Sequence, residues 1–508
     1  MRALLALVCL CASAPPGWFP GAGLLVLPGW MAFYAMGERV RRPLLLSYLV
    51  GVGHLLVFSV SLRHVAWGAV VAIAMLGGLY YLLTTWLTRS IVRFLPGSLA
   101  FGLTLAAACW LRAHIPDLYY PHAQPVHCLY HWPVLLGSVR WGSEIFGNML
   151  IGMLAAALVD LYRSWHVARP GWRRSVWMAG GTGAVILSTV VFPGSAPSGD
   201  QSVRISLLEP RLQPEDFRPF NEDPDAALRR MRVIEPTRAL VAGGDPPDLM
   251  VWPESVEVLP GERASLDLPT GTRLLAGDVL RDSSGSRVIA VLTDDRGRQL
   301  GYHEKQRLVA GGERVPYLDW LPEGVVEWIR ELFEAWMNQP LPDTQSGAPR
   351  PLLETADGVP FGALICFDNA FPEVSEDMVR RGARFLVVIS NESWYRGGDE
   401  LAQMEAMTVC RALECGVPLV RCTVDGATLV VNQEGRVVDR LPSDTPHETG
   451  PEFLTVDLMV SAAGPPALPW LHPLIRWIVL FGVLLGFGSR ILIWCRLLSL
   501  GFQRGSAA

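Results

Sequence analysis

The chain has 508 residues, of which 50% are hydrophobic and only 18% are charged. This balance excludes a disordered chain and argues against a purely soluble enzyme of this size. The net charge of −5 leaves no basic surface of the kind that nucleic acid requires, so we expect no nucleic-acid partner.

Charged residues divide the chain into three parts. Residues 1–193 hold 13 arginines and four acidic residues, residues 194–472 hold 26 basic and 44 acidic residues, and residues 473–508 hold four arginines and no acidic residue. We therefore predict an N-terminal transmembrane block of about seven helices over 1–193 and an exported soluble domain over 194–472. A C-terminal transmembrane helix with a cytoplasmic tail is predicted over 473–508.

Eight apolar runs predict membrane-spanning helices. They lie at residues 2–13, 20–36, 43–62, 66–87, 94–112, 143–162, 174–193 and 474–496. The first run is short, and the preceding Arg2 together with the small residues that follow it is also compatible with a signal peptide. Because further apolar runs follow at once, we interpret it as the first span.

Arginines in the loops predict the orientation of the helices. The loops after the second, fourth and sixth runs contain more arginine than the loops between them. By the positive-inside rule, the arginine-rich loops and both termini face the cytoplasm, and segment 194–472 lies outside.

The predicted outer loop 113–142 contains several side chains of the kinds that bind zinc. These are His114, His122, His127, Cys128 and His131. Their spacing matches no standard zinc pattern, and the loop is rich in Tyr, Trp and Pro, which is typical of a membrane interface. We therefore expect no metal site here.

Segment 194–472 is long enough for one large α/β domain. Strands are predicted at 202–208, 247–252, 273–279, 287–293, 299–304, 360–366, 384–390, 418–423 and 427–432. Helices are predicted at 223–242, 323–338, 371–382 and 400–416.

Three of the predicted strands end in reactive or polar groups. The strand that begins at Asp248 ends in the carboxylate of Glu254, the strand that begins at Phe361 ends in the thiol of Cys366, and a third continues into polar residues and Trp394. In α/β sheets, functional sites gather beyond the carboxyl ends of the strands. We therefore expect these groups to lie close together.

A single lysine, Lys305, stands among 43 basic residues. A coding bias toward arginine explains why almost all basic residues are arginine. The one lysine is present by chance or because its position needs a compact amine. A cysteine, a glutamate and this lysine suffice for covalent acyl chemistry, in which the thiolate attacks, the carboxylate moves protons and the ammonium stabilises an oxyanion. Taken alone, a strand-end cysteine is more often a core residue, so it is the combination that favours catalysis.

The predicted helix 323–338 is amphipathic. Its apolar positions are Val325, Trp328, Ile329, Leu332, Phe333 and Trp336. Two interpretations are open: the helix packs on the domain core, or it is a lid whose Trp328 and Trp336 enter the outer leaflet and admit substrate.

The reactive residues resemble those of a known superfamily. Trp252-Pro-Glu254, Lys305 in a Tyr-x-x-Lys-x-x-Leu-Val stretch, and Ile365-Cys366 are similar to the Glu–Lys–Cys triad of the nitrilase, or carbon–nitrogen hydrolase, superfamily. The resemblance implies an α-β-β-α sandwich for the exported domain. Such a domain between a seventh and an eighth span resembles the apolipoprotein N-acyltransferase family in particular.

Further positions match that family, and a few depart from it. The matches are Glu313 in Gly-Glu-Arg-Val-Pro, the stretch 390–395, Gln403, Arg411, Pro418, Arg421 and Gly426. The departures include Asp368, where the family has Glu, Met404, where it has His, and Val424, where it has Asn. This pattern indicates a divergent member or a paralogue with another amine acceptor.

The resemblance implies an acyl transfer in two steps. A fatty acyl group passes from a membrane phospholipid to Cys366 as a thioester, and then to the α-amine of the N-terminal diacylglyceryl-cysteine of an apolipoprotein. Glu254 is the implied base, Lys305 with the N–H of Phe367 holds the oxyanion, and Glu313, Asp368 and Trp394 support them. The implied enzyme needs no cofactor, and we expect a monomer in the bacterial cell (inner) membrane with its catalytic domain on the periplasmic or outer face.

Two other interpretations compete with acyl transfer. The same triad would serve a membrane-tethered nitrilase-like amidase, in which water takes the acyl group. A non-catalytic lipoprotein-binding scaffold is a third possibility, although the complete triad argues against it. Disulfides among Cys128, Cys410, Cys415 and Cys422 are compatible with an oxidising compartment, but no framework follows from the sequence.

Overall fold

The computed structural model describes ten stretches of the chain. They are residues 1–166, 172–191, 199–216, 226–256, 266–282, 285–337, 341–442, 450–469, 471–485 and residue 488. The chain forms two compact units. One comprises Met1–His114, Pro121–Gly194 and Pro469–Ala508, and the other comprises Ile115–Tyr120 and Ser195–Leu468.

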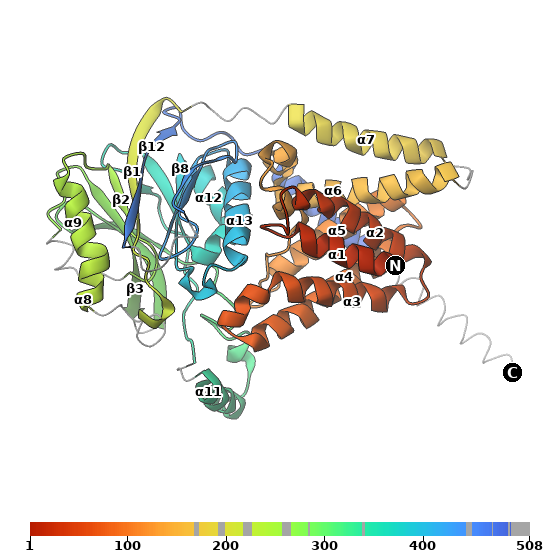
Figure 1. The fold of residues 1–508 in the computed structure, drawn as a ribbon, viewed down its shortest axis with the longest axis horizontal. Coiled ribbons are helices and arrows are strands. Elements are labelled where there is room, and N and C mark those ends of the chain that lie inside the picture. Colours follow the sequence, from red (N-terminus) through yellow and green to blue (C-terminus); the bar gives the residue numbers. More distant parts are fainter. Residues whose placement is uncertain are drawn as a thin grey trace. The chain divides into compact units, whose positions relative to one another are not determined.

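The first unit is helical, and each of its described helices overlaps one of the predicted apolar runs (Figure 1). The helices are α1 (Arg2–Ser13), α2 (Val26–Arg39), α3 (Pro43–Phe58), α4 (Trp67–Ile91), α5 (Gly97–His114), α6 (Gly137–His166), α7 (Trp172–Val191) and Leu471–Leu485. Helix α6 begins before the predicted run and bends at Gly142 and Ser143, whose backbone angles are not helical. The straight part of α6 after this bend is the predicted span.

Length and composition identify two candidate membrane spans among the described residues. Trp67–Ile91 and Pro133–His166 are long and apolar enough to cross a bilayer, and Arg2–Ser13, Ala22–Gly37, Pro43–Phe58 and Leu471–Leu485 are apolar but shorter. The predicted number of eight spans therefore stays a prediction.

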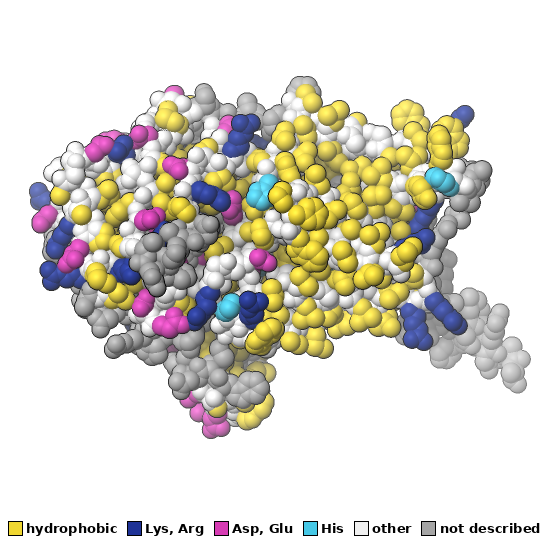
Figure 2. Space-filling model, in the orientation of Figure 1, with side chains coloured by type: hydrophobic (Ala, Val, Ile, Leu, Met, Phe, Trp, Pro, Cys, Tyr) yellow, Lys and Arg dark blue, Asp and Glu magenta, His cyan; other side chains and the backbone are white. Residues whose placement is uncertain are grey.

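The helical unit places apolar side chains outward and pairs polar ones inside. Leu76, Leu79 and Trp177 are among its many exposed large apolar residues, and Figure 2 shows such side chains over most of the visible face of this unit. Inside, the hydroxyl of Ser47 lies 2.7 Å from that of Thr85. Exposed apolar surface on this scale is typical of a surface that is covered by lipid or protein rather than by water.

The second unit contains two six-stranded sheets, with strand orders β12-β1-β2-β3-β4-β5 and β11-β10-β9-β8-β7-β6. The first sheet consists of β1 (Gln201–Glu209), β2 (Leu249–Val251), β3 (Arg273–Asp282), β4 (Gly285–Thr293), β5 (Gln299–Glu304) and β12 (Glu452–Val460). The second consists of β6 (Leu353–Glu354), β7 (Pro360–Ile365), β8 (Phe385–Ser390), β9 (Leu419–Thr423), β10 (Leu429–Val431) and β11 (Val437–Arg440).

Helices cover the outer face of each sheet (Figure 1). The first sheet is covered by the helical segments α8 (Ala226–Arg229), Arg230–Ile234 and α9 (Glu235–Ala242), and the second by α12 (Pro372–Arg380) and α13 (Glu400–Cys415). Alternation along the strands explains this layering. On β2, Leu249 and Val251 face the core between the sheets, whereas Met250 faces the covering helices. The unit is the α-β-β-α sandwich that the resemblance implied.

The sequence analysis missed three strands, β6, β11 and β12. β12 is the longest of them and pairs antiparallel with β1 over its whole length, from Gln201–Val460 to Glu209–Glu452. Its core-facing Leu454, Leu458 and Val460 alternate with more exposed residues, so a period-two signal was present. The opposite face of this edge strand carries apolar Phe453 and Met459 as well as polar Thr455 and Asp457, so the alternation of apolar and polar residues is incomplete.

Candidate active site

Three strand ends bring the predicted triad together. Glu254 follows β2, Lys305 directly follows β5, and Cys366 directly follows β7. β2 and β5 belong to one sheet and β7 to the other, so the site forms where the two sheets face each other. All three predicted residues are therefore placed at one site by elements far apart in the sequence.

Lys305 forms ion pairs with two carboxylates. Its Nζ lies 2.9 Å from Oε1 of Glu254 and 2.5 Å from Oε1 of Glu313, and only 1% of the lysine is exposed. Burial alone would lower the pKa of Lys305, but the charges of Glu254 and Glu313 outweigh it and hold that pKa well above its ordinary value. Lys305 is therefore a charged, immobile ammonium, as an oxyanion donor must be.

Glu313 is the second carboxylate that contacts Lys305. Its second oxygen, Oε2, accepts a hydrogen bond from the backbone N–H of Val309 at 2.9 Å. Burial raises the pKa of Glu313 above its ordinary value, although Lys305 opposes the shift. The predicted role of Glu313 in orienting Lys305 fits this geometry.

Cys366 occupies a strained turn at the end of β7. Its φ of 48° is in the left-handed region, which costs a residue other than glycine about 1–3 kcal/mol. It begins a short 3-10 turn, Cys366–Ala370, and its side chain is partly exposed. Burial, and then the charge of Glu254, raises the pKa of the thiol to about 12 although Lys305 opposes the shift. The resting thiol is thus protonated and needs a base.

Both carboxylate oxygens of Glu254, the predicted base, accept hydrogen bonds. Its Oε2 accepts a hydrogen bond from the backbone N–H of Asn391 at 3.0 Å, while Oε1 accepts from Lys305. On the neighbouring strand, a Cβ at Gly277 would lie 2.9 Å from the Cα of Glu254, so only glycine leaves room for this approach. Both carboxylate oxygens are therefore fixed in direction.

Asp368 ties the lysine segment to the nucleophile turn. One carboxylate oxygen accepts from the backbone N–H groups of Gln306 at 3.0 Å and Arg307 at 2.8 Å, and the other accepts from that of Ile365 at 3.3 Å. Asp368, which stands where the family has the longer Glu, thus binds both the segment after Lys305 and the end of β7. The neighbouring Phe367 is buried and packs edge-on against Phe371, with ring centroids 5.2 Å apart.

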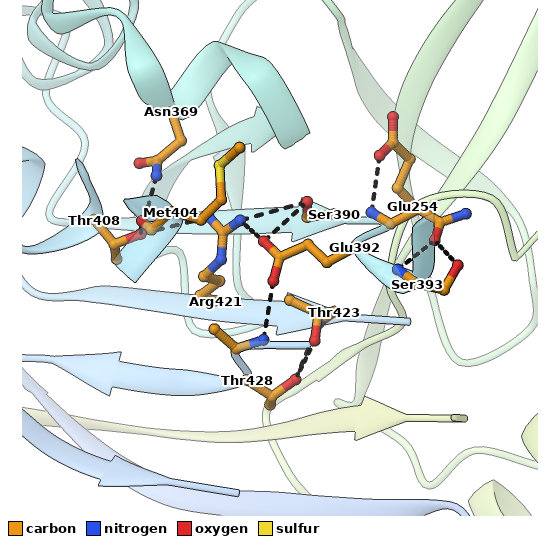
Figure 3. Close-up of polar contacts among 12 residues, drawn as sticks. Glu254, Asn369, Ser390, Glu392, Ser393, Met404, Thr408, Arg421, Thr423 and Thr428 are labelled. Carbon is orange, nitrogen blue, oxygen red and sulfur yellow. Dashed lines mark hydrogen bonds and ion pairs between the residues drawn. The ribbon is translucent and has the colours of Figure 1, made fainter. Parts of the chain in front are cut away.

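A buried ion pair behind the site was not recognised in the sequence. Arg421 on β9 pairs with Glu392, which follows β8, and neither is more than 1% exposed (Figure 3). The second oxygen of Glu392 accepts from the backbone N–H of Ala427 at 2.9 Å, and Gly426 leaves room for it, because a Cβ there would lie 2.4 Å from that oxygen. The ion pair fixes Glu392. The preceding residue, Asn391, donates the backbone hydrogen bond to Glu254.

The sequence did contain a signal for this ion pair. Glu392 follows the apolar strand Phe385–Ser390 by two residues, and Arg421 interrupts the apolar strand Leu419–Thr423. Buried charges are rarely tolerated unless they are paired, so one charge within an apolar strand and another just after a second apolar strand indicate partners.

Glu209, at the end of β1, is a second buried carboxylate near this network. The hydroxyl of Thr423 lies 3.4 Å from its Oε2, and burial raises the pKa of Glu209 to about 8 although Arg211 opposes the shift. Between pH 4.5 and about 8, the Glu209 carboxyl therefore keeps its proton in the folded protein, whereas in the unfolded chain it loses that proton above the ordinary glutamate pKa of 4.5. The free energy of unfolding must fall as the pH rises from about 4.5 to about 8, by on the order of a few kcal/mol.

We expect Glu209→Gln to remove this pH dependence, because a neutral amide needs no proton in order to be buried. The midpoint of thermal unfolding in detergent should be similar for both proteins at pH 5 and higher for the variant at pH 8. Parallel curves for the two proteins between pH 5 and pH 8 would contradict the shift at Glu209.

The other predicted residues are placed as follows. Trp394 is partly buried in the short turn Ser393–Tyr395. Trp328 lies on α11 (Glu323–Met337) and is 61% exposed, and Trp336 lies on the same helix, with a side chain outside the described residues. No residue of α11 whose side chain is described is buried, which argues against the interpretation that this helix packs on the domain core.

No disulfide bond joins the described cysteines. They are Cys9, Cys11, Cys109, Cys128, Cys366, Cys410, Cys415 and Cys422. The described part of the chain thus shows none of the disulfides that an oxidising compartment would allow, and the nucleophile candidate is unpaired.

Comparison with known proteins shows what the α/β unit is similar to. Residues 283–458 match the family described as Carbon-nitrogen hydrolase, a stretch that includes Lys305 and Cys366. The chain is 28% identical to an apolipoprotein N-acyltransferase of Geobacter metallireducens over 48% of this chain and 47% of that protein. It is 27% identical to an apolipoprotein N-acyltransferase of Ralstonia nicotianae over 87% of this chain and 85% of that protein.

These matches differ in how much they cover. The chain spans about half the length of the Geobacter relative and most of the Ralstonia relative. Among solved structures, an amidase from Nesterenkonia sp. AN1 is 19% identical, with a TM-score of 0.35, over 52% of this chain and 94% of that one. The chain is a divergent relative of the apolipoprotein N-acyltransferases, and its residues 283–458 match the carbon–nitrogen hydrolase family, a family of enzymes.

Proposed function

We propose that this protein transfers a fatty acyl group from a membrane phospholipid to the N-terminal diacylglyceryl-cysteine of apolipoproteins. The observation that carries the proposal is the ammonium of Lys305 held between Glu254 and Glu313 at the site that Cys366 enters. This arrangement supplies a nucleophile, a base and an oxyanion donor. The named relatives support the choice of lipid substrates.

The first half-reaction forms the thioester. Glu254 accepts the proton of the Cys366 thiol, and the thiolate attacks an ester carbonyl of the phospholipid. The oxyanion that forms is stabilised by Lys305 and by the backbone N–H of Phe367. The C–O bond then breaks, the leaving lysophospholipid oxygen takes the proton from Glu254, and the acyl-enzyme remains.

The second half-reaction uses the same groups in reverse. The α-amine of the diacylglyceryl-cysteine attacks the thioester carbonyl, and Glu254 takes a proton from that amine. The C–S bond breaks, the product amide leaves, and the proton passes from Glu254 to the Cys366 thiolate. The thiol pKa of about 12 makes this return favourable, so the enzyme is restored without a cofactor.

The helical unit supports a membrane location for both substrates. Its large apolar side chains are exposed along most of its helices, and two of those helices have the length and composition of a span. We place all eight helices in the bacterial inner membrane, with the α/β unit on the periplasmic face, because arginine gathers in the opposite loops.

Intact-mass analysis of the purified protein tests the proposed function against its alternatives. A fatty-acyl adduct on Cys366 that hydroxylamine removes, and that passes to a diacylglyceryl-peptide, would support transfer. Release of ammonia from amides by an unmodified protein would identify the tethered amidase. Binding of lipopeptide without any adduct or turnover would identify a scaffold.

Helix α11 fits a lid better than a core helix. Val325, Trp328 and Leu332 follow one another at helical spacing and are each at least 40% exposed, although apolar side chains are normally buried. The adjoining Trp320 is 82% exposed. The other face carries Glu323, Glu327 and further charged residues, so contact with a bilayer would depend on apolar burial rather than on attraction to anionic lipid.

We expect Trp328→Ser with Trp336→Ser to slow acylation from bilayer phospholipid, because the variant removes the aromatic side chains that would enter the outer leaflet. A short, water-soluble thioester donor should acylate the variant at the normal rate. The measurement is the rate of acyl-enzyme formation with each donor. An equal loss with both donors, together with a lowered melting temperature, would show that the two tryptophans stabilise the fold instead.

A further inference from the structure

Arg307 lies against two aromatic rings close to the active site. Its guanidinium carbon is 5.3 Å from the ring centroid of Tyr119 and 5.0 Å from that of Phe371. Those two rings meet edge-on, with centroids 5.6 Å apart. Tyr119 belongs to the stretch Ile115–Tyr120, which forms part of the α/β unit. Cation–π contacts of this kind hold a guanidinium in one plane and leave its N–H edge free to bind.

The guanidinium of Arg307 has no acidic partner in the part of the chain that the structure describes. The nearby arginines differ in this respect: Arg314 pairs with Asp319, and Arg350 pairs with Glu304. Arg307 is also only partly buried, so its donors are accessible. A fixed, accessible and unpaired guanidinium is suited to bind an anion from outside the chain.

The backbone fixes Arg307 beside the reacting groups. It follows Lys305 by two residues, and its N–H donates to Asp368 at 2.8 Å. The ring of Phe371 that it contacts packs in turn on Phe367, the residue after Cys366. One short chain of contacts therefore links the free guanidinium to the nucleophile turn.

The charge of the groups around Lys305 makes this extra cation important. With both carboxylates ionised, Lys305, Glu254 and Glu313 together carry one net negative charge, so these three side chains do not attract an anion. A phospholipid carries its phosphate on the same glycerol unit as the ester that Cys366 would attack. The donor thus needs a nearby cation that the triad does not provide.

We propose that Arg307 binds the phosphate of the acyl-donor phospholipid and thereby positions its ester at Cys366. This inference rests on the proposed function. It also makes a distinction within the reaction, because the diacylglyceryl-cysteine acceptor has no phosphate. Arg307 should therefore matter for formation of the thioester and not for its transfer to the amine.

The test compares two donors with the same acyl chains, a phospholipid and a diacylglycerol, in mixed micelles with the full chain. With phospholipid, we expect Arg307→Gln to lower kcat/KM for acyl-enzyme formation about 10- to 100-fold, the factor for a lost hydrogen bond to a charged group. With diacylglycerol, the rate should be unchanged. Transfer from the preformed acyl-enzyme to a diacylglyceryl-peptide should also be unchanged. Arg307→Lys should fall between the wild type and Arg307→Gln.

Arg298→Gln is the matched control. Arg298 lies in the turn at the other end of β5, pairs with Asp294, and is removed from Lys305 by about 20 Å of strand. It should behave as wild type, which separates the local effect of Arg307 from the loss of one positive charge. An equal loss with phospholipid and diacylglycerol, or no loss with either, would overturn the proposal.

Binding of a diether phospholipid, which has no ester to cleave, separates this inference from the proposed function. If the wild type binds it 10- to 100-fold more tightly than Arg307→Gln but forms no acyl-enzyme from any donor, the phosphate site stands and the proposed transfer fails. If the two bind it equally, the phosphate site fails even where acylation occurs. Inorganic phosphate is then added as a competitor of the diether lipid. Its failure to displace that lipid would identify the lipid headgroup as the recognised source of phosphate.

Discussion

Replacing Cys366 with serine is expected to lower acyl transfer at least ~10³-fold while the fold is retained. The substitution removes one polarisable sulfur from a turn that the hydrogen bonds of Asp368 hold in place. A hydroxyl is a much poorer nucleophile than a thiolate at neutral pH, and Glu254 cannot ionise it to the same extent. The measurement is single-turnover acylation, followed by intact mass in detergent.

Glu254→Gln is expected to give the same result for a different reason. Burial keeps the thiol pKa at about 12, so few Cys366 thiols are ionised at neutral pH without a base. Cys128→Ser is the matched control, because Cys128 is also a free, partly exposed thiol but belongs to the helical unit. Full activity in Cys366→Ser or Glu254→Gln would refute the assignment of the nucleophile or of the base.

Replacing Lys305 with arginine is expected to reduce turnover at least ~100-fold, the usual effect of removing one oxyanion donor. The lysine Nζ lies 2.9 Å from Oε1 of Glu254 and 2.5 Å from Oε1 of Glu313, and only 1% of the lysine side chain is exposed. A planar guanidinium keeps the charge but cannot place a single nitrogen between two carboxylates at those distances. The measurement is kcat and KM for both half-reactions.

Glu313→Gln provides the comparison for this variant. It leaves Lys305 paired with Glu254 and should lose less activity than Lys305→Arg, because the single amide oxygen can still accept from the ammonium, although the hydrogen bond from Val309 is then lost. Turnover close to normal in Lys305→Arg would mean that the one lysine of the chain remains by chance. A larger loss in Glu313→Gln than in Lys305→Arg would contradict the ordering of their roles.

The chain order and the local pattern of residues determined much of what the structure shows. Apolar runs predicted the places of the described helices in the helical unit, and the strands that precede Glu254, Lys305 and Cys366 were predicted within a few residues. Periodicity and strand ends are properties of neighbouring residues, so they can be read along the chain. The candidate nucleophile, base and ammonium were found because each ends an apolar strand or stands alone in the composition.

The tertiary structure decided which polar groups meet. Three such contacts join residues from different strands, turns and loops. They are the pairing of Arg421 with Glu392, the hydrogen bonds of Asp368 to two segments, and the contacts of Arg307 with Tyr119 and Phe371. Their contacts depend on how the two sheets pack and on strand register, neither of which leaves a mark in a single segment. The exposure of the apolar face of α11 could likewise not be predicted from the sequence, because an amphipathic pattern predicts an apolar face but not what covers it.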